Sequence, residues 1–164
     1  MENRIYGFEP VEDENARVLI VGSMPGAASL AVTFYYGHPR NAFWPILASV
    51  FSERMPETTE EKKALICKNR LALWDVYASC VREGSLDSAI REGEKNDFAA
   101  FFRAHPQIRA VLCNGATAYR MFDKSVCPDV PVVRLPSTSP AYTLKFDAKL
   151  SAWKHALTEY LKGE

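Results

Sequence analysis

The residues best suited to chemistry lie in one segment near the start of the chain, between Gly22 and Trp44. Within it, His38, Arg40 and Asn41 bring an imidazole, a guanidinium and a side-chain amide close together. A histidine can exchange a proton, an arginine can bind a phosphate, and a neutral amide can position water or a sugar. The spacing therefore predicts a binding or catalytic loop. Asn41 also precedes an apolar run that starts at Ala42, so capping a helix is the alternative role of its side chain.

The first half of this segment is a turn, Gly22-Ser-Met-Pro-Gly26, which follows an apolar run. Glycine and proline allow a tight turn there and let a ligand approach the backbone closely. The turn lacks the lysine of a phosphate loop and the glycine spacing of a dinucleotide-binding turn. Ser23 could act as a nucleophile, but the sequence identifies no base beside it. Five aromatic residues follow, of which one or two could stack on a flat heterocycle: Phe34, Tyr35, Tyr36, Phe43 and Trp44.

Two other loops carry polar side chains directly after apolar runs. Asp75 ends the run Leu73-Trp-Asp75, where it could cap a turn or accept hydrogen bonds from ring N–H groups of a base. Ser137, Thr138 and Ser139 lie between two prolines. This stiff stretch could be a surface turn, or it could grip a phosphate or press on a nucleic-acid duplex at a small ordering cost.

Four short apolar runs are expected to form the strands that position these loops. Each is nearly continuous rather than alternating, which is typical of strands buried on both faces of a parallel sheet. Helical patterns fill the gaps, so we predict an α/β fold: a three-layer α-β-α sandwich with a central four-stranded parallel sheet, in one domain over residues 1–164. The expected strands are Val18–Val21, Leu71–Trp74, Ile108–Cys113 and Val132–Leu135. The expected helices are Ala42–Phe51, a run capped by Thr58 that ends near Lys68, a run capped by Asn96 that ends at Ala104, Ala116–Phe122 and Leu144–Leu161.

The carboxyl ends of parallel strands share one edge of a sheet. Four loops are therefore expected to meet there and to supply the functional residues: Ser23–Asn41, Asp75–Gly84, Asn114-Gly115 and Pro136–Tyr142. The last helix is expected to pack on the sheet through an apolar stripe of Phe146, Leu150, Trp153, Leu157 and Leu161.

Composition excludes several classes of protein. Lysine plus arginine equals aspartate plus glutamate, 20 against 20, which argues against a general basic coat for nucleic acid. No apolar run reaches the roughly 20 residues that span a bilayer, and the N-terminus lacks the apolar core of a signal peptide, so a cytoplasmic location is expected. The four cysteines show no C-x-x-C pair, which predicts buried free thiols and no metal site.

Together these motifs resemble the uracil-DNA glycosylase superfamily. The most specific string is His38-Pro-Arg-Asn-Ala-Phe-Trp44; Gly22-Ser-Met-Pro-Gly26, Leu73-Trp-Asp75, Asn114-Gly115 and Pro136-Ser-Thr-Ser-Pro-Ala141 occur in the matching order. The resemblance is closest to the family-6 group of hypoxanthine (deoxyinosine) DNA glycosylases. It implies an enzyme that flips a deaminated nucleotide out of double-stranded or single-stranded DNA and hydrolyses its N-glycosidic bond. It further implies a monomer that needs no metal and no cofactor.

Two positions depart from the uracil-excising members of the superfamily. Those carry an aspartate or an asparagine where this chain has Met24, and a histidine where it has Leu135. Neither replacement can orient water or donate a hydrogen bond. The resemblance therefore assigns catalysis to Asn41, whose side-chain carbonyl would hold the attacking water. It assigns the base pocket to Gly22, Ser23, Met24, Pro25, Gly26, Tyr35, Tyr36 and Asp75, with Phe34, Tyr35 or Tyr36 stacking on the base, and DNA contacts to His38, Arg40, Ser137, Thr138 and Ser139.

Three other functions agree with the same residues. A preference for uracil in mismatches over hypoxanthine depends on pocket size. A hydrolase of small nucleotides or esters would use Ser23 or His38 and would suit the charge balance. A nucleic-acid binder without activity would account for the two apolar positions, and it would bind inosine-containing DNA without releasing a base.

Overall fold

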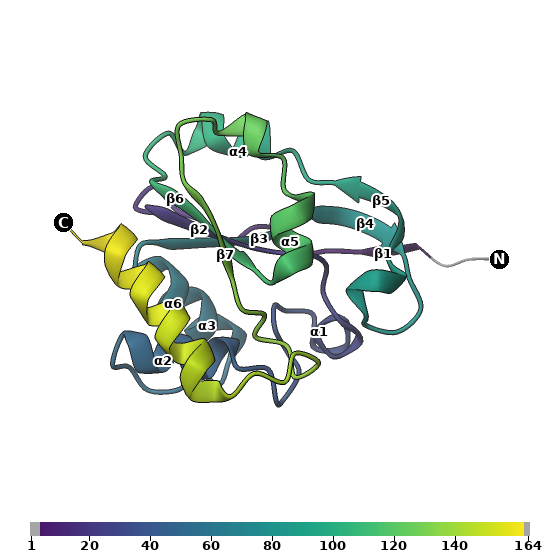
Figure 1. Ribbon diagram of the computed structural model, residues 1–164, viewed down its shortest axis with the longest axis horizontal. Helices are drawn as coiled ribbons and strands as arrows, with labels where there is room; N and C mark the ends of the chain where they lie inside the picture. The colour runs from purple at the N-terminus through teal and green to yellow at the C-terminus, as the bar shows by residue number, and fades with distance from the viewer. Residues whose placement is uncertain (1–3, 163–164) are drawn as a thin grey trace.

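A central parallel sheet organises the molecule. The computed structural model describes residues 4–162, and its four-stranded sheet has the order β3 (Leu71–Asp75), β2 (Val18–Gly22), β6 (Ala110–Asn114) and β7 (Val132–Leu135) (Figure 1). Every neighbouring pair in it is parallel. These are the four predicted strands. Their apolar runs are continuous because β2, β3 and β6 are covered on both faces.

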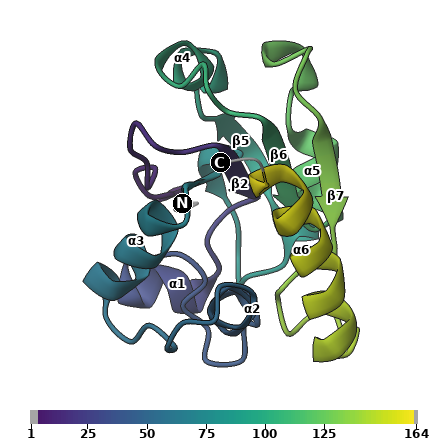
Figure 2. The ribbon, with the colours of Figure 1, turned by 90° about the vertical axis from the view of Figure 1, so that its left-hand side faces the viewer.

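Helices cover both faces of this sheet, as predicted. The helices α2 (Phe43–Val50), α3 (Thr59–Lys68) and α6 (Phe146–Leu161) pack on one face, and α4 (Phe98–Ala104) and α5 (Ala116–Met121) pack on the other. Alternate residues of β2 divide accordingly, since Ile20 joins the first core and Leu19 the second. Figure 2 shows this division, with α4 at one end of the view and α2 and α3 at the other.

A second, smaller sheet was not predicted. Its antiparallel strands are β1 (Arg4–Tyr6), β4 (Tyr77–Val81) and β5 (Arg91–Lys95), in the order β1-β4-β5. Most of the expected loop Asp75–Gly84 is therefore strand. β5 has the sequence Arg-Glu-Gly-Glu-Lys and is exposed throughout, so it carries no apolar pattern from which a strand could be predicted.

Three short helical pieces are further additions to the predicted elements. The helix α1 (Ala27–Val32) lies inside the segment expected to be a long loop, Ser23–Asn41. Two short 3-10 helices, Asp87–Ala89 and Lys124–Val126, connect later elements.

The predictions for two helix caps and for the apolar stripe of the last helix can be compared with the structure. Thr58 caps α3, and Thr58 and Glu61 bond reciprocally in a capping box. The predicted cap Asn96 is wrong: α4 is capped by Asp97, while the Asn96 amide donates to the backbone oxygen of Asp75. The predicted stripe on α6 is wrong at Phe146, the first residue of the helix, which is exposed.

The cysteines are free thiols, and most of them are buried. Cys80, Cys113 and Cys127 are buried, Cys67 is partly buried, and all are free. Within residues 4–162, no group of three His, Cys, Asp or Glu side chains is placed to hold a metal ion. In the same part of the chain no helix has the length and apolar character needed to cross a membrane.

Candidate active site

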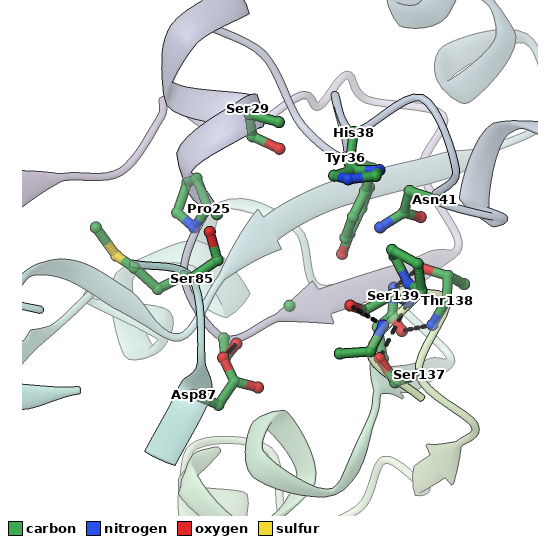
Figure 3. A pocket seen from close by; sticks show the side chains of 18 of the residues that line it. Pro25, Ser29, Tyr36, His38, Asn41, Ser85, Asp87, Ser137, Thr138 and Ser139 are labelled. Atoms are coloured by element: carbon green, nitrogen blue, oxygen red, sulfur yellow. Dashed lines mark hydrogen bonds between the residues drawn. The ribbon is translucent and has the colours of Figure 1, made fainter. Parts of the chain in front are cut away.

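A cavity of about 540 Å³ opens where the four predicted loops meet, at the carboxyl ends of the parallel strands. Its volume is typical of a small-ligand pocket. Figure 3 shows Asn41 beside Thr138 and Ser139, with Pro25, Ser85 and Asp87 across the cavity. All predicted site residues except Arg40 line it: Gly22, Ser23, Met24, Pro25, Gly26, Tyr35, Tyr36, His38, Asn41, Asp75, Ser137, Thr138 and Ser139.

Asn41 lies immediately before Ala42, the N-cap residue of α2. Its Oδ1 accepts from the backbone N–H of Phe43 at 2.9 Å, which identifies the oxygen end of the amide. The Nδ2 end is turned toward the cavity (Figure 3). The side chain thus supports the start of the helix and also faces the cavity. A water held by Oδ1 would have to use its second lone pair, because the first is engaged by Phe43.

The aromatic residues before Asn41 divide between core and cavity. Phe34 is buried against Trp44, at 6.1 Å between ring centroids, and does not line the cavity. Tyr35 lines it, but the hydroxyl donates to the backbone oxygen of Glu9 at 2.7 Å, away from the pocket. Tyr36 lines the cavity (Figure 3), with its hydroxyl buried beside Gly22 and its ring packed on Phe43 at 4.1 Å between centroids. Of the three residues expected to stack on a base, Tyr36 is therefore best placed.

His38 and Arg40 point in different directions. Nδ1 of His38 accepts from the backbone N–H of Arg40 at 3.0 Å, so a neutral His38 carries its hydrogen on Nε2. His38 lines the cavity. The Arg40 side chain is exposed and outside it. A contact between Arg40 and DNA stays a prediction, and it would have to form on the outer surface of the protein.

The loop Pro136–Tyr142 is tied to the end of β6 and to α2. Asn114 and Thr138 form a two-bond pair: Nδ2 donates to the Thr138 hydroxyl and Oδ1 accepts from the Thr138 N–H, both at 2.9 Å. The backbone N–H of Ala42 donates to the oxygen of Thr138. Thr138 is 1% exposed, so its side chain supports the loop from inside, and a contact between Thr138 and DNA stays a prediction. Asn114, which belongs to one of the four loops expected to supply functional residues, lines the cavity.

Helix α6 holds the same loop from behind. Lys149 is 4% exposed, and its ammonium donates to the backbone oxygens of Tyr142 at 2.7 Å and Ser139 at 3.1 Å. Burial lowers the pKa of this lysine. The indole N–H of Trp153 donates to the oxygen of Pro136 at 2.9 Å. Two side chains of one helix therefore set the position of the loop.

The opposite wall comes from the β4–β5 connection, residues 82–90, which sequence reasoning missed. Ser23 donates to Oδ1 of Asp87 at 2.7 Å, and Ser85 accepts from the backbone N–H of Ala27 at 2.8 Å. The buried Arg82 donates to the backbone oxygen of Pro25. Gly84-Ser-Leu-Asp87 is recognisable as a turn. Its contact with the first loop depends on the small sheet, whose strand β5 has no apolar pattern.

Asp75 is the buried acid of the cavity, with 3% of its surface exposed. Burial, and then the charge of Asp87, raise the pKa of this carboxyl to about 7, while Arg82 acts in the opposite direction. Burial also raises the pKa of the Tyr36 hydroxyl well above its usual value. A proton on Asp75 is therefore exchangeable near neutral pH.

The two apolar positions singled out in the sequence belong to the core. Met24 is part of the hydrophobic cluster on one face of the sheet and Leu135 part of the cluster on the other. A family model described as the uracil DNA glycosylase superfamily matches residues 9–162. The chain belongs to the uracil DNA glycosylase superfamily.

Relatives within the superfamily match nearly the whole chain. A hypoxanthine DNA glycosylase of Methanosarcina barkeri is 34% identical over 153 residues, which are 92% of this chain and 96% of that protein. A hypoxanthine DNA glycosylase of Methanosarcina acetivorans is 41% identical over 113 residues, 68% of this chain and 72% of that protein. A solution NMR structure from Methanosarcina acetivorans, provisionally assigned as a uracil DNA glycosylase, superposes with a TM-score of 0.85 at 32% identity. It covers 98% of this chain and 100% of its own.

Proposed function

We propose that this protein is a hypoxanthine DNA glycosylase, which hydrolyses the N-glycosidic bond of deoxyinosine in DNA. The observation that carries the proposal is the cavity at the carboxyl edge of the sheet, where Asn41 and Asp75 face a volume of about 540 Å³. That volume accommodates a flipped purine. The two relatives named hypoxanthine DNA glycosylase support the choice of base.

In the proposed reaction, the deaminated nucleotide leaves the helix at a cost of a few kcal/mol, which is lower for a mispaired base. Asn41 positions the attacking water through the free lone pair of Oδ1, and its Nδ2 donates to the substrate. Backbone N–H groups of the first loop face the charge that develops on the departing base. Tyr36 contacts the ring, and the backbone of Ser137–Ser139 binds the phosphates beside the lesion.

Uracil is the second candidate base. It is favoured by the provisional assignment of the solution NMR structure, which is 32% identical. A hydrolase of small nucleotides has less support, because Ser23 donates to the carboxylate of Asp87 rather than to a histidine base.

The test is base release from end-labelled duplexes that carry inosine, uracil or xanthine, followed by alkaline cleavage at abasic sites. We expect cleavage of the inosine duplex to exceed that of the uracil duplex. Cleavage of uracil alone would replace hypoxanthine by uracil as the substrate. Binding of the inosine duplex without cleavage would identify an inactive binder, and turnover of free nucleosides without duplex binding would identify a small-nucleotide hydrolase.

A further inference from the structure

Asp75 is held against the end of a neighbouring strand at the floor of the cavity. It ends β3 and pairs in register with Gly22 at the end of β2. A Cβ atom on Gly22 would lie 2.3 Å from Oδ1 of Asp75 and 2.7 Å from the hydroxyl oxygen of Tyr36. Both side chains therefore approach the backbone where only glycine leaves room. The position of the carboxyl is fixed by the sheet rather than by a loop.

The surroundings of Asp75 stabilise a negative charge only in part. Its Oδ2 is buried without a hydrogen-bond partner, and so is the hydroxyl of Tyr36. The guanidinium of Arg82 donates to the backbone oxygens of Pro25 and Gly84 rather than to Asp75. A buried carboxylate without partners is costly, whereas the neutral acid is tolerated.

The groups around Asp75 come from two segments, the β4–β5 connection and the first loop. In the β4–β5 connection, Asp87 disfavours the charge of Asp75, while Arg82 favours it. Tyr36 approaches Asp75 from the first loop, and Tyr35, whose hydroxyl is turned to Glu9, also interacts with its charge. His38 and Tyr142 are the remaining titratable side chains among the residues that line the described cavity. Any pH-dependent step at Asp75 must therefore be separated from titration of His38 and Asp87.

We propose that Asp75 acts as a carboxylic acid, with one oxygen accepting from N1–H of a flipped hypoxanthine and the other donating to its O6. This inference rests on the proposed function. N1–H and O6 are adjacent on the base, and a carboxylic acid presents an acceptor and a donor at matching positions, whereas a carboxylate presents no donor. Only the acid can therefore neutralise charge that builds up on O6 as the base departs.

The step moves one electron pair and one proton. The C1′–N9 bond of deoxyinosine breaks, and its electron pair moves into the purine ring. The carboxyl proton of Asp75 passes to O6, water bonds to C1′, and the proton that this water loses returns to Asp75. The products are the abasic sugar and the hydroxy form of hypoxanthine, which reverts to the lactam in solvent.

The test is the pH dependence of single-turnover hypoxanthine release from an inosine duplex, for the wild-type protein and Asp75→Asn. The amide presents an acceptor and a donor at every pH, so it imitates the hydrogen bonding of the acid without transferring a proton. We expect the wild-type rate constant to fall about 30-fold between about pH 6 and pH 8.5. The Asp75→Asn rate constant should start lower and change less than about threefold. Circular dichroism at each pH checks that both proteins are folded.

Two outcomes would overturn the inference. A wild-type rate that rises with pH would make the carboxylate the active form, and this sign is decisive even if Asp75→Asn does not fold. An equal fall in Asp75→Asn would assign the titration to another group, such as His38. A wild-type protein that releases no hypoxanthine at any pH would overturn the proposed function itself, a result distinguishable from either of these.

Discussion

The side chain of Asn41 combines two tasks that are usually separate. Its oxygen accepts from the first N–H of α2, and its nitrogen faces the cavity. The bond to Phe43 restricts the side chain to one orientation, so the amide is already positioned before a substrate arrives. The same bond means that substitutions at this residue affect the fold as well as the reaction.

Replacing Asn41 by alanine is expected to lower single-turnover hypoxanthine release by about 10²–10³-fold, by analogy with the loss of one polar group at a transition state. The loss of the bond to Phe43 should cost about 1 kcal/mol of the free energy of unfolding. Quenched single-turnover assays and urea denaturation measure the two effects. Asn41→Asp is the matched control, because aspartate can still accept from the Phe43 N–H but lacks the amide nitrogen. Full activity of Asn41→Ala would exclude a catalytic role.

Asp75 is expected to make the stability of the protein depend on pH. Its pKa is about 7 in the folded protein and near the ordinary value of about 3.9 in the unfolded chain. Between these values the folded state keeps a proton that the unfolded state has lost, so the free energy of unfolding falls as pH rises from about 4 to 7. Asp75→Asn does not lose stability in this way. Its free energy of unfolding relative to that of the wild type should therefore rise by about 2–3 kcal/mol between about pH 5 and pH 8.

Urea denaturation across this pH range measures the effect, with Asp147→Asn, an exposed acid on α6, as control. A constant difference between Asp75→Asn and the wild type would show that this carboxyl does not titrate on unfolding.

Two supports, a helix and a connection between two strands, position the two walls of the cavity. Helix α6 holds the loop Pro136–Tyr142 through Lys149 and Trp153, and the β4–β5 connection holds the first loop through Arg82, Ser85 and Asp87. Neither support faces DNA in the proposed function. Both act by keeping backbone groups in place, which lowers the ordering cost of binding.

Lys149→Met is expected to weaken binding of an inosine duplex by at least about 10-fold, because two hydrogen bonds from a charged donor are lost. Fluorescence anisotropy with a labelled duplex measures the binding, and thermal denaturation checks the fold. Lys154→Met, an exposed lysine on the same helix, is the matched control. Equal weakening by both substitutions would indicate a loss of surface charge rather than of loop position.

The charge balance of the whole molecule predicts how it meets DNA. Lysine and arginine together number 20, as do aspartate and glutamate, and no lysine or arginine is among the residues that line the described cavity. Contacts to phosphates should therefore be few. We expect the logarithm of the binding constant to fall with the logarithm of salt concentration with a slope no steeper than about −4. Anisotropy titrations between about 50 and 200 mM salt measure this slope, and one near −8 would require a basic surface away from the cavity.

The sequence by itself determined the four strands of the central sheet and the loops that carry the functional residues. It also showed that His38 and Asn41 lie in the same loop segment. It could do so because strands buried on both faces leave continuous apolar runs, and because the carboxyl ends of parallel strands must meet at one edge. The capping box of α3 was equally predictable, since both of its residues lie within one turn.

Only the tertiary structure decided which side chains face the cavity. Tyr35 turns its hydroxyl to Glu9, Lys149 is buried behind a loop, and the wall at Ser85–Asp87 rests on a strand with no apolar residue. The raised pKa of Asp75 likewise depends on neighbours that are distant in sequence. Each of these features results from contacts between distant segments, and burial by such contacts leaves no periodic signal in the residues themselves.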